Sequence, residues 1–455
     1  MNSIAFDVEN SKGFLTRIEK FFSRYRIGSI LKQCNAYKKQ GLPVVRLVQY
    51  LFQLVFQGRS MFADMRSQKA PGFGKDTIYR LENADYIDWK RFTTLVSADI
   101  VKETIAPLTS DSRRSAFVVD DSIFDRNRSQ KVELLTRQYD HANHRYVKGF
   151  RMLTLGWSDG VTFLPVNSCL LSTENTKKQL CKAKEKTNGS IAAVARKLAQ
   201  TKATEVVPIL VKEAQNAGIQ PKYILFDSWF SSPKGISSMK ELDLDVVAMV
   251  KNSQKVYYLY NGKRQSVKDI YAQNKKRRGR SRYLLSVTAS IENENAEIPV
   301  RFVFIRNRNN RKDYLVLAST DTSLSEDEII QLYGKRWDIE VFFKVCKSLL
   351  KLAKENRSLS YDAMCAHTAI VFLRYMFLAV SIREDEDIRT AGPMFCLVSD
   401  ELADISLKEA MEKLQLFLEK LVEGFNVAKE EIEAIVDDFV ASLPKSLARF
   451  LPGCC

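Results

Sequence analysis

The most informative stretch of the chain is Tyr333-Gly-Lys-Arg336-Trp-Asp-Ile-Glu340-Val-Phe-Phe-Lys-Val-Cys-Lys347. It follows a helix start signal, because Ser325 opens a capping box. The spacing predicts one continuous helix that carries four functional side chains on a single face, since their offsets fit a period of 3.6 residues. These side chains are Tyr333, Arg336, Glu340 and Lys347.

A helix face of this composition indicates a specific chemistry. Solvated faces usually alternate their charges, and buried faces rarely carry any. A carboxylate can hold a metal ion, and neighbouring cations can hold phosphate groups. An ordinary amphipathic helix with ion pairs such as Arg336–Glu340 would contain the same residues. The segment by itself leaves both interpretations open.

The charge of the chain is large and unevenly distributed. Its 455 residues include 70 Lys and Arg against 54 Asp and Glu, a net charge of +16. Residues 382–455 contain 16 acidic and 8 basic side chains, so residues 1–381 carry a net charge of +24. A basic surface kept for solubility fits a smaller excess, so we expect a polyanionic partner, most simply nucleic acid.

The composition argues against several other classes of protein. The N-terminus lacks an apolar segment typical of a signal peptide, and the apolar stretch 371–382 is short and contains Arg374. The eight Cys include no CxxC pair, and only three His occur, which argues against a zinc site. We therefore expect reduced thiols in a cytoplasmic protein without a membrane segment.

The pattern of apolar residues divides the chain into five regions. Residues 1–110 are predicted to be helical, and residues 111–251 show the element order β, β-β, α, β, α, β of a ribonuclease-H-like sheet. Residues 252–322 are β-rich and read as an insertion into this core. Residues 323–380 return to core helices, and residues 381–455 form acidic amphipathic helices. The expected fold is an α/β ribonuclease-H-like core with a β-rich insertion, flanked by helical N- and C-terminal domains.

Two further carboxylates follow apolar strands upstream. Asp121 ends the strand in Val118-Val-Asp-Asp-Ser122, and Asp227 ends the strand in Ile224-Leu-Phe-Asp-Ser-Trp-Phe230. Open α/β sheets bind ligands at such strand ends, and oxygen ligands suit Mg²⁺ on phosphate substrates. A lone Asp at a strand end is more often a turn former or a cap. Asp120 adjoins Asp121, and alternation along the strand turns only one of the two inward.

The combination of motifs resembles a known family. Tyr-x2-Arg-x3-Glu-x6-Lys resembles the signature of bacterial cut-and-paste insertion-sequence transposases of the DDE type. The resemblance implies that Asp121, Asp227 and Glu340 are the catalytic residues and the metal ligands. Asp121 is preferred over Asp120 because it directly precedes Ser122, as the first Asp of this family usually precedes Ser or Thr. It also implies Mg²⁺ or Mn²⁺ as cofactor, with two ions in each active site.

The same resemblance assigns DNA contacts. It implies that Tyr333, Arg336 and Lys347 position phosphates around the scissile bond. Tyr314 stands where this family often has a Trp that captures a flipped base during hairpin formation, although a strand Tyr packed on one face fits equally well. Trp229 is expected to belong to the core beside the active site.

A basic cluster in the insertion is a further candidate for DNA contact. Lys275, Lys276, Arg277 and Arg278 can grip the DNA backbone, and a solvated loop is the competing interpretation. The implied function is a DNA transposase that cleaves at terminal inverted repeats and joins the freed 3′-hydroxyls to target DNA. It would act as a homodimer on double-stranded DNA, with residues 1–110 binding the ends and residues 381–455 pairing the subunits. The alternatives are a metal-dependent nuclease without strand transfer and a catalytically inactive DNA-binding derivative.

Overall fold

The structure is a computed structural model of the whole chain. It describes residues 16–66, 71–110, 112–140, 143–175, 177–292, 297–307, 310, 313–355, 357–384 and 390–403. Most of the acidic region 381–455 lies outside the described residues, and so does its expected role in dimerisation.

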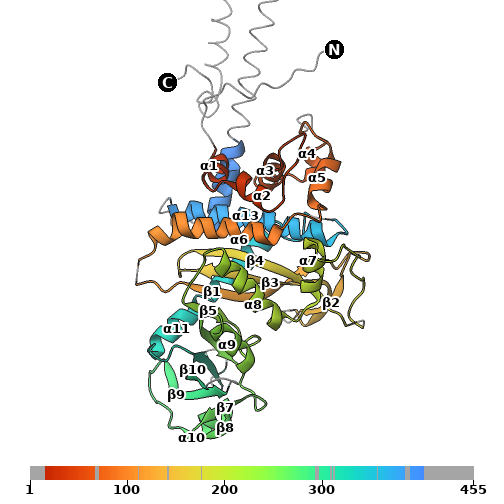
Figure 1. The fold of residues 1–455 in the computed structure, drawn as a ribbon. Helices are drawn as coiled ribbons and strands as arrows, with labels where there is room; N and C mark the ends of the chain where they lie inside the picture. Colours follow the sequence, from red (N-terminus) through yellow and green to blue (C-terminus); the bar gives the residue numbers. More distant parts are fainter. Residues whose placement is uncertain are drawn as a thin grey trace, which may run out of the picture.

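One mixed sheet of eleven strands runs through the described part of the chain (Figure 1). Its order is β2-β3-β1-β5-β6-β11-β10-β9-β7-β8, and β4 also pairs with β3. The strands are β1 (Ala116–Asp125), β2 (Thr136–Asp140), β3 (Arg145–Ser158), β4 (Phe163–Leu171), β5 (Tyr223–Phe226), β6 (Asp245–Val250), β7 (Tyr257–Tyr260), β8 (Lys263–Ser266), β9 (Tyr283–Glu292), β10 (Glu297–Arg306) and β11 (Tyr314–Ser319).

The centre of the sheet is formed by the strands that follow the first helical region. β1 pairs in parallel with β5, and β5 pairs in parallel with β6, whereas β3 runs antiparallel to both β1 and β4. The parallel strands are nearly continuous apolar runs, because both faces of a parallel sheet are covered. All four residues of β5 are buried. The α/β expectation for this part of the chain is therefore confirmed.

Helices cover the sheet and form further layers beyond it. The described helices are α1 (Arg17–Arg24), α2 (Ile27–Gln33), α3 (Val44–Leu54), α4 (Met61–Asp64), α5 (Lys75–Glu82), α6 (Trp89–Ile100), α7 (Ile191–Gln200), α8 (Ala203–Asn216), α9 (Pro233–Lys240), α10 (Val267–Gln273), α11 (Glu326–Gly334), α12 (Trp337–Ser348) and α13 (Tyr361–Glu384). Short π and 3₁₀ turns follow α6, at Val101–Ile105 and Ala106–Leu108, and another helix covers 391–403. In Figure 1, α6 and α13 lie between the sheet and the layer formed by α1 to α5.

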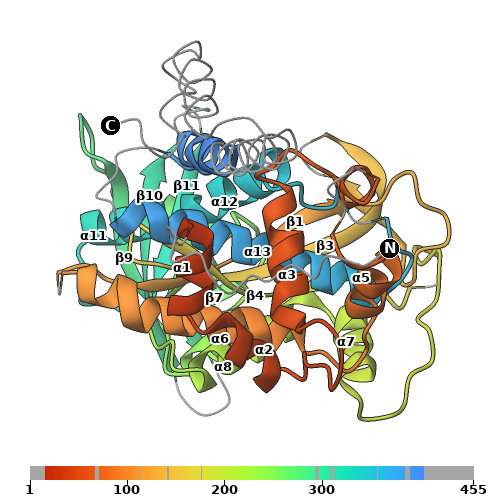
Figure 2. The same ribbon diagram turned by 90° about the horizontal axis from the view of Figure 1, so that it is seen from above.

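Helix α13 is the centre of the helical layers. By length and composition it could cross a bilayer, but 83% of its most apolar window is buried inside the protein. Its Arg374 is fully buried and donates hydrogen bonds to the backbone oxygens of Leu51, Phe52 and Leu350. The same guanidinium pairs with Glu355 at 2.8 Å. These contacts fix the end of α3 to α13, and Figure 2 shows the two helices crossing.

An aromatic cluster attaches the N-terminal helices to α13. The rings of Phe21, Phe52 and Phe56 all contact Phe377, with centroids 5.4 to 5.8 Å apart and steep interplanar angles. Edge-to-face packing of this kind adds to the energy of burial. The helices of residues 16–110 therefore share their core with α13. Their binding of DNA ends stays a prediction.

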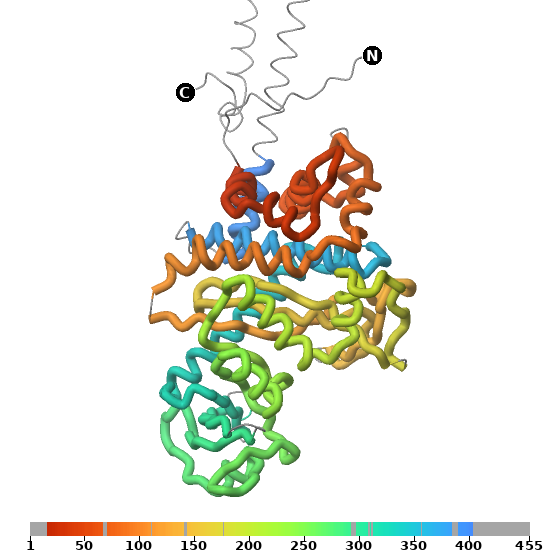
Figure 3. The backbone as a smooth tube through the Cα atoms, in the orientation of Figure 1, coloured from red at the N-terminus to blue at the C-terminus, as the bar shows by residue number. Residues whose placement is uncertain are grey.

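The β-rich region 252–322 continues the central sheet. Its last strand, β11, runs antiparallel to β6, with Val316 opposite Val250 and Leu317 opposite Met249. β10 and β9 then extend the sheet outward, followed by β7 and β8. Figure 3 traces this extension as the lobe farthest from the N-terminal helices. The insertion is thus hydrogen-bonded directly to the last strand of the core.

Candidate active site

Two aspartates lie side by side at the carboxyl ends of parallel strands. Val119 of β1 is opposite Phe226 of β5, and Asp120 and Asp227 each follow this pair directly. Residues at equivalent positions of paired strands point to the same side of the sheet. Both carboxylates therefore lie on the edge where open α/β sheets place their ligand sites.

The helix expected over the signature is broken in two. α11 ends at Gly334 and α12 begins at Trp337. Across the break the backbone forms i to i−3 hydrogen bonds, from the N–H of Lys335 to the oxygen of Leu332 and from the N–H of Arg336 to the oxygen of Tyr333. Such bonds tighten the chain locally into a 3₁₀-like turn. The prediction of one continuous helix is wrong, whereas the capping box at its start is confirmed.

The break coincides with contacts to the β3–β4 turn. Lys335 Nζ donates to the backbone oxygen of Arg114 at 2.5 Å and to that of Asp159 at 3.1 Å. One turn later, the Asp338 carboxylate accepts a hydrogen bond from Ser158 Oγ at 2.7 Å. Gly160 in this turn has a φ of +89°, and a Cβ there would lie 2.8 Å from Lys335 Cε. These tertiary contacts anchor the start of α12 beside β1.

Arg336 connects the strand carboxylate to the helix carboxylate. Its guanidinium lies 3.2 Å from Asp120 Oδ2 through one nitrogen and 2.6 Å from Glu340 Oε1 through another. The Arg336 side chain is only 13% exposed, whereas the side chains of Asp120 and Glu340 are 23% and 36% exposed. Within the described ranges, no three His, Cys, Asp or Glu side chains are grouped closely enough to hold one metal ion in this arrangement. The positive charge between the carboxylates of Asp120 and Glu340 is the guanidinium of Arg336, in place of a metal ion.

The environment of Asp120 disfavours its charged form. Burial is the largest cause and raises the pKa of Asp120 to about 7, and the negative charges of Asp121 and Asp227 act in the same direction. The Asp121 N–H and the Arg336 guanidinium act in the opposite direction but only in part. Asp120 is therefore a partly buried carboxyl, and the positive charge around it does not offset the cost of its burial.

Asp121 turns away from this group. It forms an ion pair with Arg151, a residue of the neighbouring strand β3. Because successive side chains of a strand point to opposite faces, Asp121 and Asp120 cannot both face α12. The structure places Asp120 beside Arg336 and Glu340, so the preference for Asp121 at this position is not supported by the geometry.

Tyr333 is partly buried beside the same carboxylates, and its hydroxyl oxygen is fully buried. Burial raises the pKa of Tyr333 to about 12, the charges of Asp227 and Asp120 raise it further, and the nearby Arg336 opposes them. The hydroxyl has no hydrogen-bond partner of suitable geometry among the described residues, and neither has Arg336 Nε. Buried polar groups are normally satisfied, so these two require an explanation.

Lys347 contacts β1 at Ser122, two residues after Asp120. Its Nζ lies 2.5 Å from Ser122 Oγ, and Ser122 shares a strand face with Asp120. Burial lowers the pKa of Lys347. Although the helix is broken, Arg336 and Lys347 thus still face one strand, and Arg336 holds Glu340 beside it.

Tyr314 and the basic cluster lie apart from this group. The ring of Tyr314 stacks on Tyr271 with centroids 4.0 Å apart, and its hydroxyl donates to Asn252 at 3.3 Å. Lys276 Nζ lies 4.6 Å from the centroid of the Tyr271 ring, and Arg277 lies over the ring of Tyr283. Tyr314 is the first residue of β11 and lies beside the end of β6. The cluster Lys275–Arg278 lies farther from the carboxylates. None of these residues contacts the carboxylates.

Trp229 differs from its expected place in the core. It is 52% exposed, although it lies only two positions after Asp227. Lys251 Nζ lies 4.1 Å from the centroid of its ring, and the Arg151 guanidinium lies 5.7 Å from it. Sequence reasoning missed all three residues as a group, because nothing in the sequence places Arg151 and Lys251 beside Trp229.

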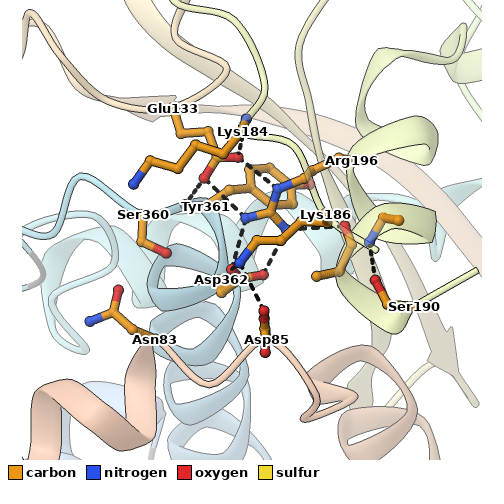
Figure 4. A network of polar contacts seen from close by, with 12 residues as sticks. Asn83, Asp85, Glu133, Lys184, Lys186, Ser190, Arg196, Ser360, Tyr361 and Asp362 are labelled. Carbon is orange, nitrogen blue, oxygen red and sulfur yellow. Dashed lines mark hydrogen bonds and ion pairs between the residues drawn. The ribbon is translucent and has the colours of Figure 1, made fainter. Parts of the chain in front are cut away.

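A second polar network supports the core away from the carboxylates. Arg196 is buried and pairs with Glu133 at 2.6 Å and with Asp362 at 2.7 Å (Figure 4). Lys186 pairs with Asp85 at 2.9 Å in the same network. Burial opposes the ionisation of Glu133, but hydrogen bonds from Arg196 and from the backbone hold its pKa below the usual value. The network joins α7 and α13 to the loops that carry Asp85, Glu133 and Lys186.

Comparison with known protein families assigns the chain to a family. A family model described as DDE superfamily endonuclease matches residues 46–304, which is more than half of the chain. The chain belongs to the DDE superfamily endonuclease family. This membership makes the protein a nuclease or transposase type of enzyme with DNA as the implied substrate, and members of this superfamily typically use divalent metals.

The matched range covers only part of the candidate site. It includes Asp120 and Asp227 of this DDE endonuclease but ends before Glu340. The association of Glu340 with the two aspartates therefore rests on the structure. No curated protein matches the chain significantly.

Proposed function

We propose that this DDE endonuclease is a cut-and-paste transposase of the subfamily with the Tyr-Arg-Glu-Lys signature. It cleaves at the ends of an insertion sequence and joins the freed 3′-hydroxyls to target DNA. The observation that carries the proposal is that Arg336 bridges Asp120 of β1 and Glu340 of α12, while Asp227 follows the neighbouring strand β5 at the position equivalent to Asp120. The strand order β4-β3-β1-β5-β6 supports a ribonuclease-H-like core beneath them.

We assign the metal ligands to Asp120, Asp227 and Glu340, with Asp120 in the place for which the sequence favoured Asp121. The chemistry of the donors suits Mg²⁺ or Mn²⁺, because these ions prefer carboxylate oxygens. The ions would take the place of the Arg336 guanidinium, which separates Asp120 from Glu340 in this structure. The raised pKa of Asp120 supports this assignment, since the site lacks positive charge that a cation would supply. Two bound ions would activate the attacking water or hydroxyl and stabilise the leaving oxygen.

The signature side chains hold the phosphate in this proposal. Arg336 can exchange its carboxylate bridge for a phosphate, because a guanidinium binds either group through two N–H donors. Tyr333 offers a hydroxyl with no hydrogen-bond partner among the described residues, and Lys347 offers an ammonium that donates to Ser122. Donors already in place before the substrate arrives favour the charged transition state of phosphoryl transfer.

The remaining regions take supporting roles. The net charge of +24 over residues 1–381 supports contact with double-stranded DNA, both terminal inverted repeats and target. The helices of residues 1–110 would recognise the ends, and two subunits would pair on DNA through residues 381–455. Tyr314 remains the candidate for base capture if a hairpin forms. The reaction would take place in the cytoplasm on bacterial DNA.

Strand transfer from pre-cut ends tests the proposal. Labelled DNA that already carries free 3′-hydroxyl ends is incubated with a supercoiled plasmid, the protein and Mg²⁺. A transposase joins the label to the plasmid, whereas a nuclease without strand transfer degrades or leaves the ends unjoined. An inactive DNA-binding derivative binds the ends but neither cuts nor joins them. The Asp227→Asn protein is the control, because it should bind the same ends without joining them.

A further inference from the structure

A basic pocket adjoins the carboxylate site on the side of Asp121. It has a volume of about 430 Å³, a size typical of ligand pockets. Five of its lining residues are cationic and none is acidic. The cationic residues are Arg137, Arg151, Lys178, Lys202 and Lys251.

An exposed tryptophan forms one wall of this pocket. Trp229 is 52% exposed, and the ring faces Lys251 and Arg151 at the distances given above. Large exposed aromatic rings beside cations are the arrangement by which proteins bind single-stranded nucleic acid, since the ring stacks on a base and the cations hold the backbone. The combination therefore points to a nucleotide.

The start of α8 contributes a further anion-binding element. Its N-cap residue, Lys202, makes no side-chain capping hydrogen bond, and Ala203 and Thr204 line the pocket. The first N–H groups of this fourteen-residue helix therefore lack a side-chain partner, and the positive end of the helix dipole lies at the pocket. The helix start adds to the cations and to the ring of Trp229.

The pocket is connected to the carboxylates through two residues. Arg151 pairs with Asp121, which is adjacent to Asp120, and Trp229 follows Asp227 by two positions. A DNA strand whose scissile phosphate lies at Asp120 and Asp227 would reach the pocket within a short distance. The lining contains five cations and no carboxylate, and of these cations Arg151 forms an ion pair, with Asp121 outside the lining. The pocket therefore keeps a net positive charge that favours an anionic occupant.

We propose that the Trp229 pocket binds an unpaired nucleotide of the DNA strand next to the scissile phosphate. Its base stacks on Trp229, and its phosphates contact Lys251, Lys202 and the start of α8. The inference rests on the proposed function only in taking DNA as the substrate. It concerns binding, and it requires no metal.

The test compares DNA ends in the presence of a chelator. The dissociation constant of the full-length protein is measured for a blunt duplex and for the same duplex with a short single-stranded overhang of either polarity. We expect the wild-type protein to prefer one overhang over the blunt end. Trp229→Ala should reduce this preference by roughly fivefold or more, the effect of losing one base–aromatic stack, and Trp229→Phe should keep most of it.

Cation variants separate nucleotide binding from general attraction. Lys202→Ala and Lys251→Ala should weaken binding of the overhang. Lys212→Ala, an exposed lysine farther along α8, should not and serves as the matched control. An unchanged preference in Trp229→Ala overturns the proposal. If only the cation variants weaken binding, equally for blunt and overhanging DNA, the pocket holds duplex backbone and the proposal also fails.

The same measurements distinguish this inference from the proposed function. Asp120→Asn should abolish cleavage and leave the overhang preference intact. A protein that cuts and joins nothing but keeps a Trp229-dependent preference would contradict the transposase proposal alone. Melting temperatures of all variants must match the wild type, and Lys251→Ala, which leaves the ring in place, provides a second reading if Trp229→Ala is unstable.

Discussion

Asp120 and Asp227 occupy equivalent positions in two neighbouring parallel strands. Each directly follows a residue of the pair Val119–Phe226, so both carboxylates project from the same edge of the sheet. Their mutual repulsion adds to burial in raising the pKa of Asp120 to about 7. Like charges held together in this way are costly unless a cation joins them, which links the topology of the sheet to metal-dependent chemistry.

The two adjacent aspartates of β1 should differ in their effect on cleavage. Asp120→Asn, Asp227→Asn and Glu340→Gln should each remove detectable cleavage, because each loses a ligand. Asp121→Asn should retain activity, since it breaks only the ion pair with Arg151. Initial rates of end cleavage in Mg²⁺ measure the difference. Activity in Asp120→Asn together with loss in Asp121→Asn would restore the opposite assignment.

Cleavage should depend on pH through Asp120. With a pKa of about 7, this carboxyl is largely protonated below neutral pH and must lose its proton before it can bind a cation. We expect the rate at limiting Mg²⁺ to rise with pH around 7, and the midpoint to move to lower pH as Mg²⁺ is increased. A midpoint that does not respond to Mg²⁺ would show that another group limits the rate.

Stability in the absence of metal should depend on pH with the opposite sign. In the folded state the pKa values of Asp120 and Glu82 are both about 7, raised mainly by burial, and in the unfolded state both groups ionise near their usual values of about 4. The folded state thus binds more protons between pH 4 and 7, so the free energy of unfolding falls as pH rises through this interval.

Two variants separate these contributions. Glu82→Gln and Asp120→Asn should each reduce the loss of stability between acidic and neutral pH, as followed by chemical denaturation. Only Asp120→Asn should affect cleavage, because Glu82 lies on α5 beside Glu355 and away from the site. A steep pH dependence that survives in both variants would assign it to other groups.

Tyr333→Phe should lower the rate of cleavage without lowering the free energy of unfolding. The Tyr333 hydroxyl has no hydrogen-bond partner in the part of the chain that the structure describes, so its removal should leave the free energy of unfolding unchanged or raise it by about 1 kcal/mol. If the hydroxyl is kept for the scissile phosphate, cleavage should nevertheless fall. The control is Tyr361→Phe, which removes a hydrogen bond to the Leu170 oxygen at 3.0 Å and should destabilise by about 1 kcal/mol. Equal cleavage by Tyr333→Phe and wild type would assign Tyr333 to packing.

The predicted strands and helix starts agree with the structure where neighbouring residues in the sequence determine them. Apolar runs predicted the strands, and the capping box at Ser325 predicted the start of α11, because both signals involve only neighbouring residues. The break before α12 could not be predicted in this way. It is accompanied by contacts of Lys335 and Asp338 with the β3–β4 turn, which lies about 180 residues earlier in the sequence.

The choice between Asp120 and Asp121 illustrates a second limit. Strand alternation shows that only one can face the helix, but it does not say which. The answer requires the register of β1 on β5 and the position of α12, both of which depend on distant residues. Trp229 is a similar case, since its exposure follows from the arrangement of β3 and β6 around it rather than from its own apolar character.

Binding of DNA should be strongly salt-dependent, and the insertion cluster provides the test. Residues 1–381 carry a net charge of +24, and each phosphate neutralised on B-DNA contributes a log–log slope of about −0.9. Replacing Lys275, Lys276, Arg277 and Arg278 with Ala should make the slope shallower if this cluster contacts the backbone. The preference for particular ends should stay the same, because backbone contacts position DNA without reading its sequence. An unchanged slope would leave the cluster as a solvated loop, in which Lys276 and Arg277 lie over the rings of Tyr271 and Tyr283.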